Sequence, residues 1–285
     1  MRTDANPSPL VQSQLRKKKK NAEKKGKEFK VFVPTILDPR AAERALVKEY
    51  KQRYRELLAL VDEMLINRID DLLDRDSSEK PKTDALADDV FVIINGIKVE
   101  FERRFSPSRV RNKLKDVGGD VEVHNKGQIN KVFRSTVGVD VFKSEPWLQP
   151  QVENFIEQNV GLIKAVDEKY MGEIQEIVFR GARTGMSTKD IAAEIRKRGK
   201  IADGRAEGIA RDQIQKFNGQ LAQLRQVDLG VRRYRWRTAL DERVREEHSR
   251  REGKIFSWDD PPDDGHPGEP INCRCYAEPV LEDLI

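Results

Sequence analysis

The chain is poor in cysteine, histidine and aromatic residues: its 285 residues include two cysteines, three histidines and only 7% Phe, Trp and Tyr. Two cysteines make no disulfide framework, and a bridge between Cys273 and Cys275 would be strained at that separation. We therefore expect a reduced, cytoplasmic setting. No apolar run approaches the roughly 18 residues that a membrane-spanning helix needs. The N-terminus also lacks the apolar core of a secretory signal, so we expect no membrane partner.

Several enzyme motifs are missing as well. The sequence has no G-x-S-x-G, no P-loop and no H-E-x-x-H, and we predict no catalytic residues. Charged residues make up 36% of the chain, and the mean hydropathy is −0.72. These values favour a mainly α protein with exposed charged faces. The predicted fold has long amphipathic helices and a small C-terminal α+β module in the order strand, helix, strand, loop, strand.

Positive charge is concentrated near the N-terminus. Residues 1–30 carry ten basic and three acidic side chains, a net charge of +7, so the other 255 residues sum to −2. Because such a segment repels itself and has little apolar content, we predict a basic disordered arm over 1–37. It either binds a polyanion such as double-stranded DNA or is a solvated tail without a fixed partner. The predicted nucleic-acid-binding residues are Arg16, Lys17, Lys18, Lys19, Lys20, Lys24 and Lys25.

Apolar periodicity predicts an N-terminal helical region over 38–146 and a central helical region over 147–230. The first contains a helix over 40–74, with an apolar stripe that buries against a partner or folds back on the helix at 147–180. Residues 84–105 fit a helix better than a hairpin. Gly118 and Gly119 are expected to end a short helix, before an extended segment at 121–123 and another helix at 129–135. In the second region, Ser187 and Asp190 form a capping box for a short helix to about Arg198. Gly181, Gly185 and Gly199 are interpreted as helix ends, and another helix covers 204–229.

The C-terminal module, predicted over 231–285, starts with alternation of period two. Aromatic side chains share one face of the strand at 231–238 and arginines share the other. Salt bridges to nearby carboxylates explain the arginines better than nucleic-acid binding does. A helix capped by Thr238 or Asp241 should reach about Arg251, followed by strands at 254–258 and 273–281. The predicted core of the module consists of Trp236, Thr238, Asp241 and Arg243.

One histidine and both cysteines are grouped in this module. Cys273 and Cys275 are expected to share one face of a strand, 25 residues after His248, so that three zinc-type ligands converge. Candidates for the fourth ligand are His266, Asp241 and a water molecule. A small domain would gain folding free energy from Zn²⁺. The alternative is a metal-free core in which the cysteines are buried and the histidine is hydrogen-bonded.

An ordered set of motifs resembles the C-terminal domain of tailed-phage minor head proteins, the phage head morphogenesis or Mu F-like family. The set runs from about Trp147 to Val280. Its upstream members are Asn159-Val160-Gly161-Leu162-Ile163, Gly185-Met186-Ser187 and Ala206 with Ile209-Ala210-Arg211-Asp212. Its downstream members are Trp236-Arg237-Thr238, Asp241-Glu242-Arg243-Val244-Arg245 with His248, Gly253-Lys254-Ile255-Phe256 and Cys273-Arg274-Cys275.

The resemblance implies a structural virion protein, present in few copies and made in the host cytoplasm. Its expected partners are the portal protein, the capsid interior or scaffold, and double-stranded DNA. Its expected place is the head interior near the portal. The shared domain implies no enzymatic activity. A zinc-dependent nuclease or toxin-like domain acting on nucleic acid remains the alternative.

Overall fold

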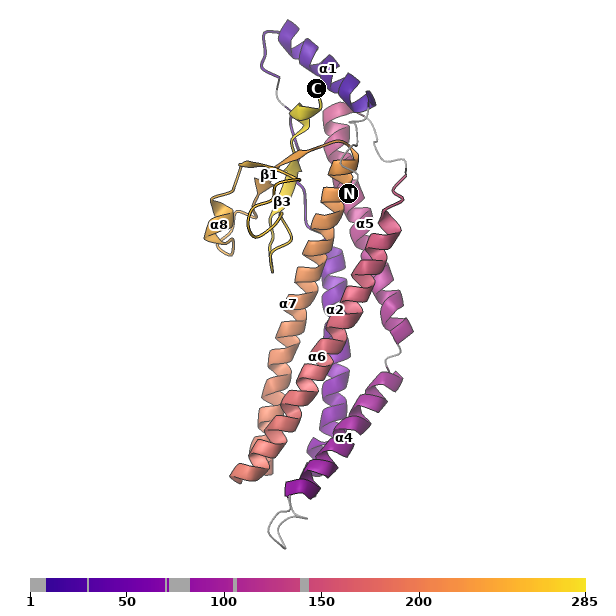
Figure 1. The fold of residues 1–285 in the computed structure, drawn as a ribbon, viewed down its shortest axis with the longest axis vertical. Coiled ribbons are helices and arrows are strands. Elements are labelled where there is room, and N and C mark those ends of the chain that lie inside the picture. Colours follow the sequence, from indigo (N-terminus) through magenta and orange to yellow (C-terminus); the bar gives the residue numbers. More distant parts are fainter. Residues whose placement is uncertain (1–8, 30, 70, 72–82, 105–106, 139–143) are drawn as a thin grey trace. The chain divides into compact units, whose positions relative to one another are not determined.

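A computed structural model describes residues 9–29, 31–69, 71, 83–104, 107–138 and 144–285. Of these described residues, 71% are helical, and a small three-stranded antiparallel sheet lies near the C-terminus. The predicted fold class is therefore confirmed (Figure 1). Within the described ranges, no helix is both long and apolar enough to cross a membrane.

The chain forms two compact units, each assembled from separate stretches of sequence. Unit 1 comprises Met1–Glu43, Val117–Val152 and Arg211–Ile285, and unit 2 comprises Arg44–Asp116 and Glu153–Ala210. Each predicted region is one continuous stretch of the chain, whereas each unit combines stretches that are far apart in the sequence. The predicted region boundaries therefore stay a prediction.

Unit 2 contains most of α2 (Arg40–Met64), the short helix η1 (Ile66–Arg68) and α4 (Thr83–Arg104). The stripe of α2 packs against α6 (Leu148–Thr184): Tyr54 and Tyr170 are both buried, and their ring centroids lie 5.2 Å apart. The stripe therefore folds back within the chain. Helix α4 confirms the prediction of a helix in place of a hairpin. The predicted helix over 40–74 is too long, because α2 ends at Met64; its last residues from 72 lie outside the described residues.

The glycines were poor guides to helix ends. Residues 107–137 form one helix, α5 (Pro107–Val137), which passes through both glycines at 118–119. Thr188–Asp228 is likewise one helix, α7, with Gly199 inside it. Val117 and Val121, on either side of Gly118 and Gly119, are buried. A Cβ at Gly199 would lie 2.6 Å from Leu58 Cδ2. Tertiary packing thus outweighs the low helix propensity of glycine, which costs about 1 kcal/mol per residue.

Two glycines that were predicted to end helices in the second helical region, Gly181 and Gly185, differ in their positions. Gly181 lies inside α6 and is not a helix end, whereas Gly185, with φ +70°, follows the last residue of that helix as predicted. Ser187 accepts a hydrogen bond from the backbone N–H of Asp190 at 3.2 Å. The predicted cap is therefore confirmed, although the helix that it begins is much longer than expected.

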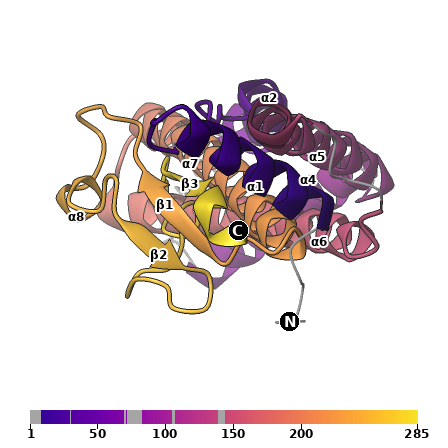
Figure 2. The same cartoon turned by 90° about the horizontal axis from the view of Figure 1, so that it is seen from above.

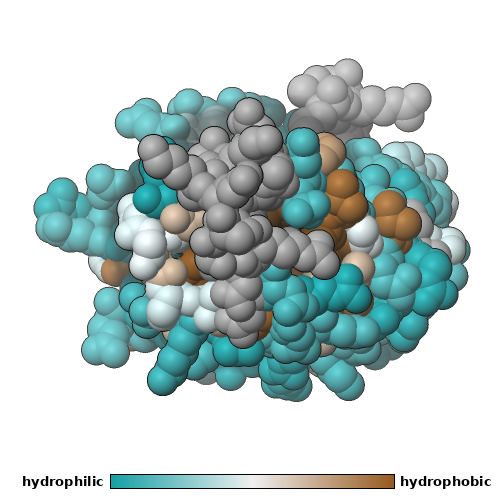
Figure 3. All heavy atoms as spheres, turned by 90° about the horizontal axis from the view of Figure 1, so that it is seen from below, coloured by the Kyte–Doolittle hydropathy of each residue, from teal (hydrophilic) through white to brown (hydrophobic). Residues whose placement is uncertain are grey.

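Hydrophilic side chains cover most of the molecular face in Figure 3, in keeping with the charged composition.

The N-terminal segment is not the disordered arm that we expected. Residues 9–24 form α1 (Pro9–Lys24), whose buried residues are Val11 and Leu15. These two side chains are four positions apart, so they share one helix face. They join the apolar cluster that contains Leu281 and Leu284 of η2 (Leu281–Leu284), and α1 lies beside the C-terminus in Figures 1 and 2. Two buried apolar residues, one helical turn apart, thus anchor a helix whose other residues are mostly basic or polar.

The C-terminal module has the predicted order of strand, helix, strand, loop and strand. Strands β1 (Arg233–Arg237), β2 (Ile255–Ser257) and β3 (Tyr276–Pro279) form an antiparallel sheet in the order β2-β1-β3. The intervening helix α8 (Glu246–Ser249) is shorter than predicted, and neither proposed cap begins it. The Thr238 hydroxyl donates to Glu252 Oε2 at 2.8 Å, and Asp241 binds Arg274. Both side chains are thus engaged elsewhere.

Candidate metal centre

The inner face of β1 provides the apolar floor of the site. Tyr234 and Trp236 are fully buried, and the Trp236 ring meets the His248 ring edge-on at a centroid distance of 5.2 Å. Thr238 is also buried, as predicted for the core. Asp241 and Arg243 are exposed, so the prediction that they belong to the core is wrong. Asp241 instead accepts from the backbone N–H of Arg243 and from Arg274, which organises the loop before α8.

The outer face of β1 is neutralised by carboxylates, as we predicted. Arg233 makes two hydrogen bonds of 2.6 Å to Asp283. Arg237 Nε lies 2.8 Å from Glu278 Oε2, and Arg235 Nε lies 3.4 Å from Oε1 of the same glutamate. These arginines thus hold β3 and η2 to the strand, which leaves less of their charge for a nucleic acid.

His248, Cys273 and Cys275 converge as predicted. His248 Nδ1 lies 3.4 Å from Cys275 Sγ and 3.7 Å from Cys273 Sγ. All three ligand atoms lie within 4.8 Å of one another, and the residues are only 2%, 7% and 3% exposed, respectively for His248, Cys275 and Cys273. The short helix α8 supplies the imidazole. Both thiols lie where the long loop over 259–272 leads into β3. The last turn of that loop, not a regular strand, therefore brings the sulfurs together.

A carboxylate orients the imidazole. His248 Nε2 lies 2.9 Å from Asp264 Oδ2, and Arg251 Nη1 donates to the other oxygen of that carboxylate at 2.5 Å. Burial by itself would raise the pKa of Asp264, but hydrogen bonds from His248 and Arg251 bring it below its ordinary value. In the tautomer that donates from Nε2 to the Asp264 carboxylate, the lone pair of Nδ1 faces the two sulfurs. Histidine ligands of metals commonly have such a carboxylate partner.

The two thiols differ in acidity. Hydrogen bonding with Cys275 lowers the pKa of Cys273 to about 6, and the backbone N–H of Gly268, 3.5 Å from its sulfur, acts in the same direction. The same thiol–thiol contact raises the pKa of Cys275, to which burial adds. Cys273 is therefore the more acidic of the two thiols. A metal ion would displace the protons of both, because the thiolate is the form that ligates.

The spacing of the three ligand atoms matches zinc chemistry. With Zn–S about 2.3 Å and Zn–N about 2.0 Å in a tetrahedron, a nitrogen and a sulfur ligand lie roughly 3.5 Å apart. The two Nδ1–Sγ distances of 3.4 and 3.7 Å bracket that value. The donor set of one imidazole and two thiols also suits Zn²⁺ better than Mg²⁺ or Ca²⁺, which prefer oxygen ligands. These residues therefore fit a zinc ion in both geometry and chemistry.

Neither residue predicted as a fourth ligand joins the cluster. His266 Nδ1 lies 2.9 Å from the Tyr234 hydroxyl, and burial lowers the pKa of His266. Asp241 is exposed and paired with Arg274. Among the described residues, the group of His, Cys, Asp and Glu side chains with metal-ligand spacing contains only His248, Cys273 and Cys275. A water molecule is thus the remaining candidate of the three.

The long loop is held in place by residues that sequence reasoning missed. Asp212 on α7 accepts a hydrogen bond from the backbone N–H of Asn272 at 2.7 Å, immediately before the first cysteine. Gly219 on the same helix lets the loop backbone approach, since a Cβ there would lie 2.8 Å from Pro267 O. Asp264 was missed as well, because four aspartates lie between 259 and 264 and sequence alone does not choose among them.

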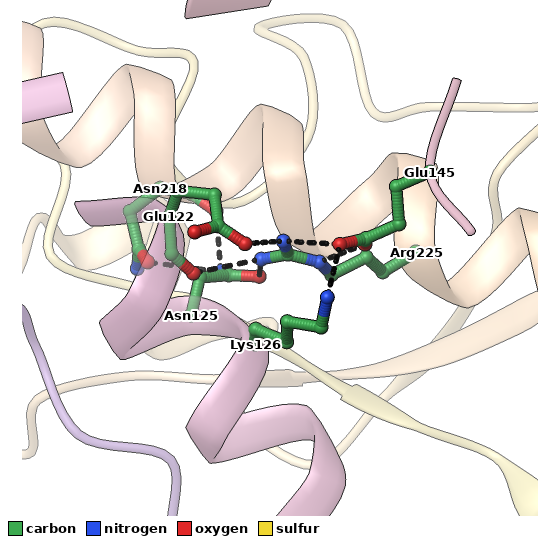
Figure 4. Close-up of polar contacts among 6 residues, drawn as sticks. All are labelled: Glu122, Asn125, Lys126, Glu145, Asn218 and Arg225. Carbon is green, nitrogen blue, oxygen red and sulfur yellow. Dashed lines mark hydrogen bonds and ion pairs between the residues drawn. The ribbon is translucent and has the colours of Figure 1, made fainter. Parts of the chain in front are cut away.

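A buried ion cluster in unit 1 was also missed. Arg225 on α7 is fully buried, and its Nε lies 2.6 Å from Glu145 Oε1. Its other nitrogens donate to Glu122 Oε1 and Asn125 Oδ1 on α5, both at 2.8 Å, and Lys126 also pairs with Glu145 (Figure 4). Buried charges need such partners, because an unpaired one costs several kcal/mol. This cluster ties α5 and α7 together on the unit that carries the module.

The predicted nucleic-acid-binding residues lie on or directly after α1 and are all exposed. The helix places them around an axis that is anchored by its two buried apolar residues. The basic segment is therefore a fixed cationic surface of unit 1 over the residues of α1.

Comparison with known proteins supports the resemblance seen in the motifs. Residues 172–278 match the family described as Phage Mu protein F like protein. This segment includes the whole cluster and is similar to that family. A Haemophilus influenzae (strain Rd) relative, described as an uncharacterized protein, is 33% identical over 187 residues, which cover 64% of this chain and 42% of the relative. The match thus spans less than half of the relative's length, and no solved structure matches.

Proposed function

We propose that this chain is a phage minor head protein that acts in head assembly, in association with the portal and inside the capsid. The observation that carries the proposal is the family match over 172–278, which covers the end of α6, all of α7, and most of the C-terminal module with its buried cluster. The motifs upstream of the module occur in the order that the resemblance requires.

Burial of the cluster supports assembly over catalysis. A zinc-dependent nuclease needs a water-bearing metal position that the substrate can reach from solvent, where the phosphodiester and the attacking water meet. Here the three candidate ligands are at most 7% exposed. The Trp236 ring contacts His248, and the backbone N–H of Gly268 contacts Cys273. A polymer substrate has no access to such a site without opening of the loop.

Association with the portal is tested directly by fractionating assembled heads. Heads from the phage that encodes this chain are purified by gradient sedimentation and then dissociated under mild conditions. We expect the chain to sediment with intact heads and to co-purify with the portal after dissociation, in fewer copies than the major capsid protein. A chain that stays in the soluble fraction while heads and portal sediment would contradict the proposal.

We also propose that α1 contacts packaged DNA through its phosphates. Lys17–Lys20 are exposed, and the turn that precedes them is anchored by Val11 and Leu15. Each phosphate contact adds about 0.9 to the slope of log K against log salt for duplex DNA. Lys→Gln at the four positions preserves helix propensity and should reduce that slope by about 3 to 4.

The matched control removes the same charge elsewhere. Exposed lysines outside α1 provide it, and Lys→Gln at four of them should leave the slope nearly unchanged: Lys113, Lys115, Lys189 and Lys197. Binding is measured by fluorescence anisotropy on duplex DNA over a series of salt concentrations. Equal reductions in both variants would show a diffuse effect of net charge and would remove α1 from the role.

A further inference from the structure

We propose that His248 Nδ1, Cys273 Sγ and Cys275 Sγ bind one Zn²⁺, with water in the fourth position, and that this ion closes the C-terminal module. The inference stands on the geometry of the module and does not depend on the proposed function. The imidazole nitrogen already lies at tetrahedral ligand spacing from each sulfur, and all three atoms lie within 4.8 Å of one another. Binding therefore needs little rearrangement of the fold.

The orientation of the imidazole is the second observation. Asp264 holds Nε2 at 2.9 Å and is itself fixed by Arg251, whose guanidinium lies over the Trp236 ring at 5.0 Å. A histidine that only satisfied a buried thiol would need no such support. A ligand does, because the lone pair of Nδ1 must be aimed at the ion. The contacts around His248 are thus those of a metal ligand whose orientation is fixed by neighbouring residues.

The third observation is what the ion would join. His248 comes from α8, whereas both cysteines directly follow the loop over 259–272 and precede β3. That loop has no regular strand or helix, and the module has a three-stranded sheet of short strands. Domains with so small a core commonly gain their stability from a metal or disulfides. One zinc ion would therefore join α8 to the end of the loop, just before β3.

Metal content and spectra test the proposal on the full chain. Protein produced in zinc-supplemented medium and purified without chelators should contain about one zinc per chain by mass spectrometry of the metal. After replacement by Co²⁺, thiolate-to-cobalt charge-transfer bands should appear together with the visible bands of tetrahedral cobalt. Metal well below one equivalent even after addition of zinc, or a cobalt spectrum without thiolate bands, would overturn it.

Variants assign the ligands. His248→Ala should abolish stoichiometric binding, whereas His124→Ala, a histidine on α5 that contacts Leu37 O, should retain it. Asp264→Asn should weaken zinc affinity roughly 10- to 100-fold, whereas the exposed neighbour Asp263→Asn should not. Retention of one zinc by His248→Ala, or equal effects of the two aspartate variants, would contradict the assignment.

A measurement on the unsubstituted protein covers the case in which a variant fails to fold. Both thiols should react slowly with a disulfide reagent in the zinc-loaded chain. After removal of the metal by a chelator they should react much faster, and added zinc should restore protection. Equal reaction rates in all three states would show that the thiols hold no metal.

Discussion

At the scale of single residues, the close approach between α7 and the long loop depends on a missing side chain. A Cβ at Gly219 would lie 2.8 Å from Pro267 O and 3.4 Å from Gly268 Cα. Both neighbours are backbone atoms, which cannot turn away as a flexible side chain can. The adjacent Gly268 N–H donates to Cys273, so the approach also positions the first thiol. A glycine that seems unfavourable in a helix is thus explained by the site.

Gly219→Ala should therefore destabilise the protein, although alanine is the better helix former. Overpacking of this kind costs roughly 1–3 kcal/mol. The control is Gly208→Ala in the same helix, where nothing lies within 4 Å of the added Cβ. That change should stabilise by up to about 1 kcal/mol. Urea unfolding of both variants measures the difference, and two changes of the same sign would contradict the role of Gly219.

At the scale of elements, α2 and α6 are joined by a buried ion pair. Arg53 Nη2 lies 3.0 Å from Asp167 Oδ2, and Arg53 Nε lies 3.2 Å from the same oxygen. Burial raises the pKa of Asp167 to about 6, and the Arg53 guanidinium offsets this only in part. The carboxylate thus loses more by leaving water than it gains from its partner, as is common for buried pairs.

This raised pKa predicts a pH dependence of stability. The folded chain holds the Asp167 proton more tightly than the unfolded chain does, so this group's contribution to stability declines as pH rises from about 4 to about 6. A difference of about two pH units corresponds to roughly 2–3 kcal/mol. Asp167→Asn should remove that decline, as measured by urea unfolding across this pH range.

The control for this experiment is Asp116→Asn, an exposed aspartate of the same unit. It removes one carboxylate without touching the pair. If Asp167→Asn and Asp116→Asn leave the same pH profile as the unsubstituted chain, burial does not govern the ionisation of Asp167.

Much of the element pattern could be predicted from periodicity alone. The helix at α4 and the strand at β1 were correctly identified because their apolar faces repeat with the right period. The continuity of α5 and α7 could not be, because it depends on contacts that bury the residues around internal glycines. Helix α1 was missed because its anchor is only two residues, and their partners lie at the opposite end of the sequence.

The candidate site could be predicted in its ligands but not in its surroundings. Rare residue types, grouped within 28 positions, pointed to His248, Cys273 and Cys275. Asp264, Asp212 and Gly219 belong to common residue types in unremarkable stretches, and only the path of the long loop gives them a role. The same holds for Arg225, one of many arginines, whose burial follows from the packing of α5 against α7.

At the scale of the whole molecule, the family match begins in unit 2 and continues into the C-terminal part of unit 1, where it includes the candidate metal centre. The same unit carries the basic helix α1, which packs on η2 just after β3. Proposed DNA contact and proposed metal binding are therefore features of one unit. Unit 2 contains helices whose apolar stripes are buried against one another in a single cluster.

X-ray absorption at the zinc edge tests the central claim most directly, since it reports which atoms surround the metal in the full-length protein. The arrangement of His248, Cys273 and Cys275 predicts two sulfur neighbours at about 2.3 Å and two nitrogen or oxygen neighbours at about 2.0 Å. A shell of nitrogen and oxygen alone would contradict it, because the zinc would then lie away from the two thiols.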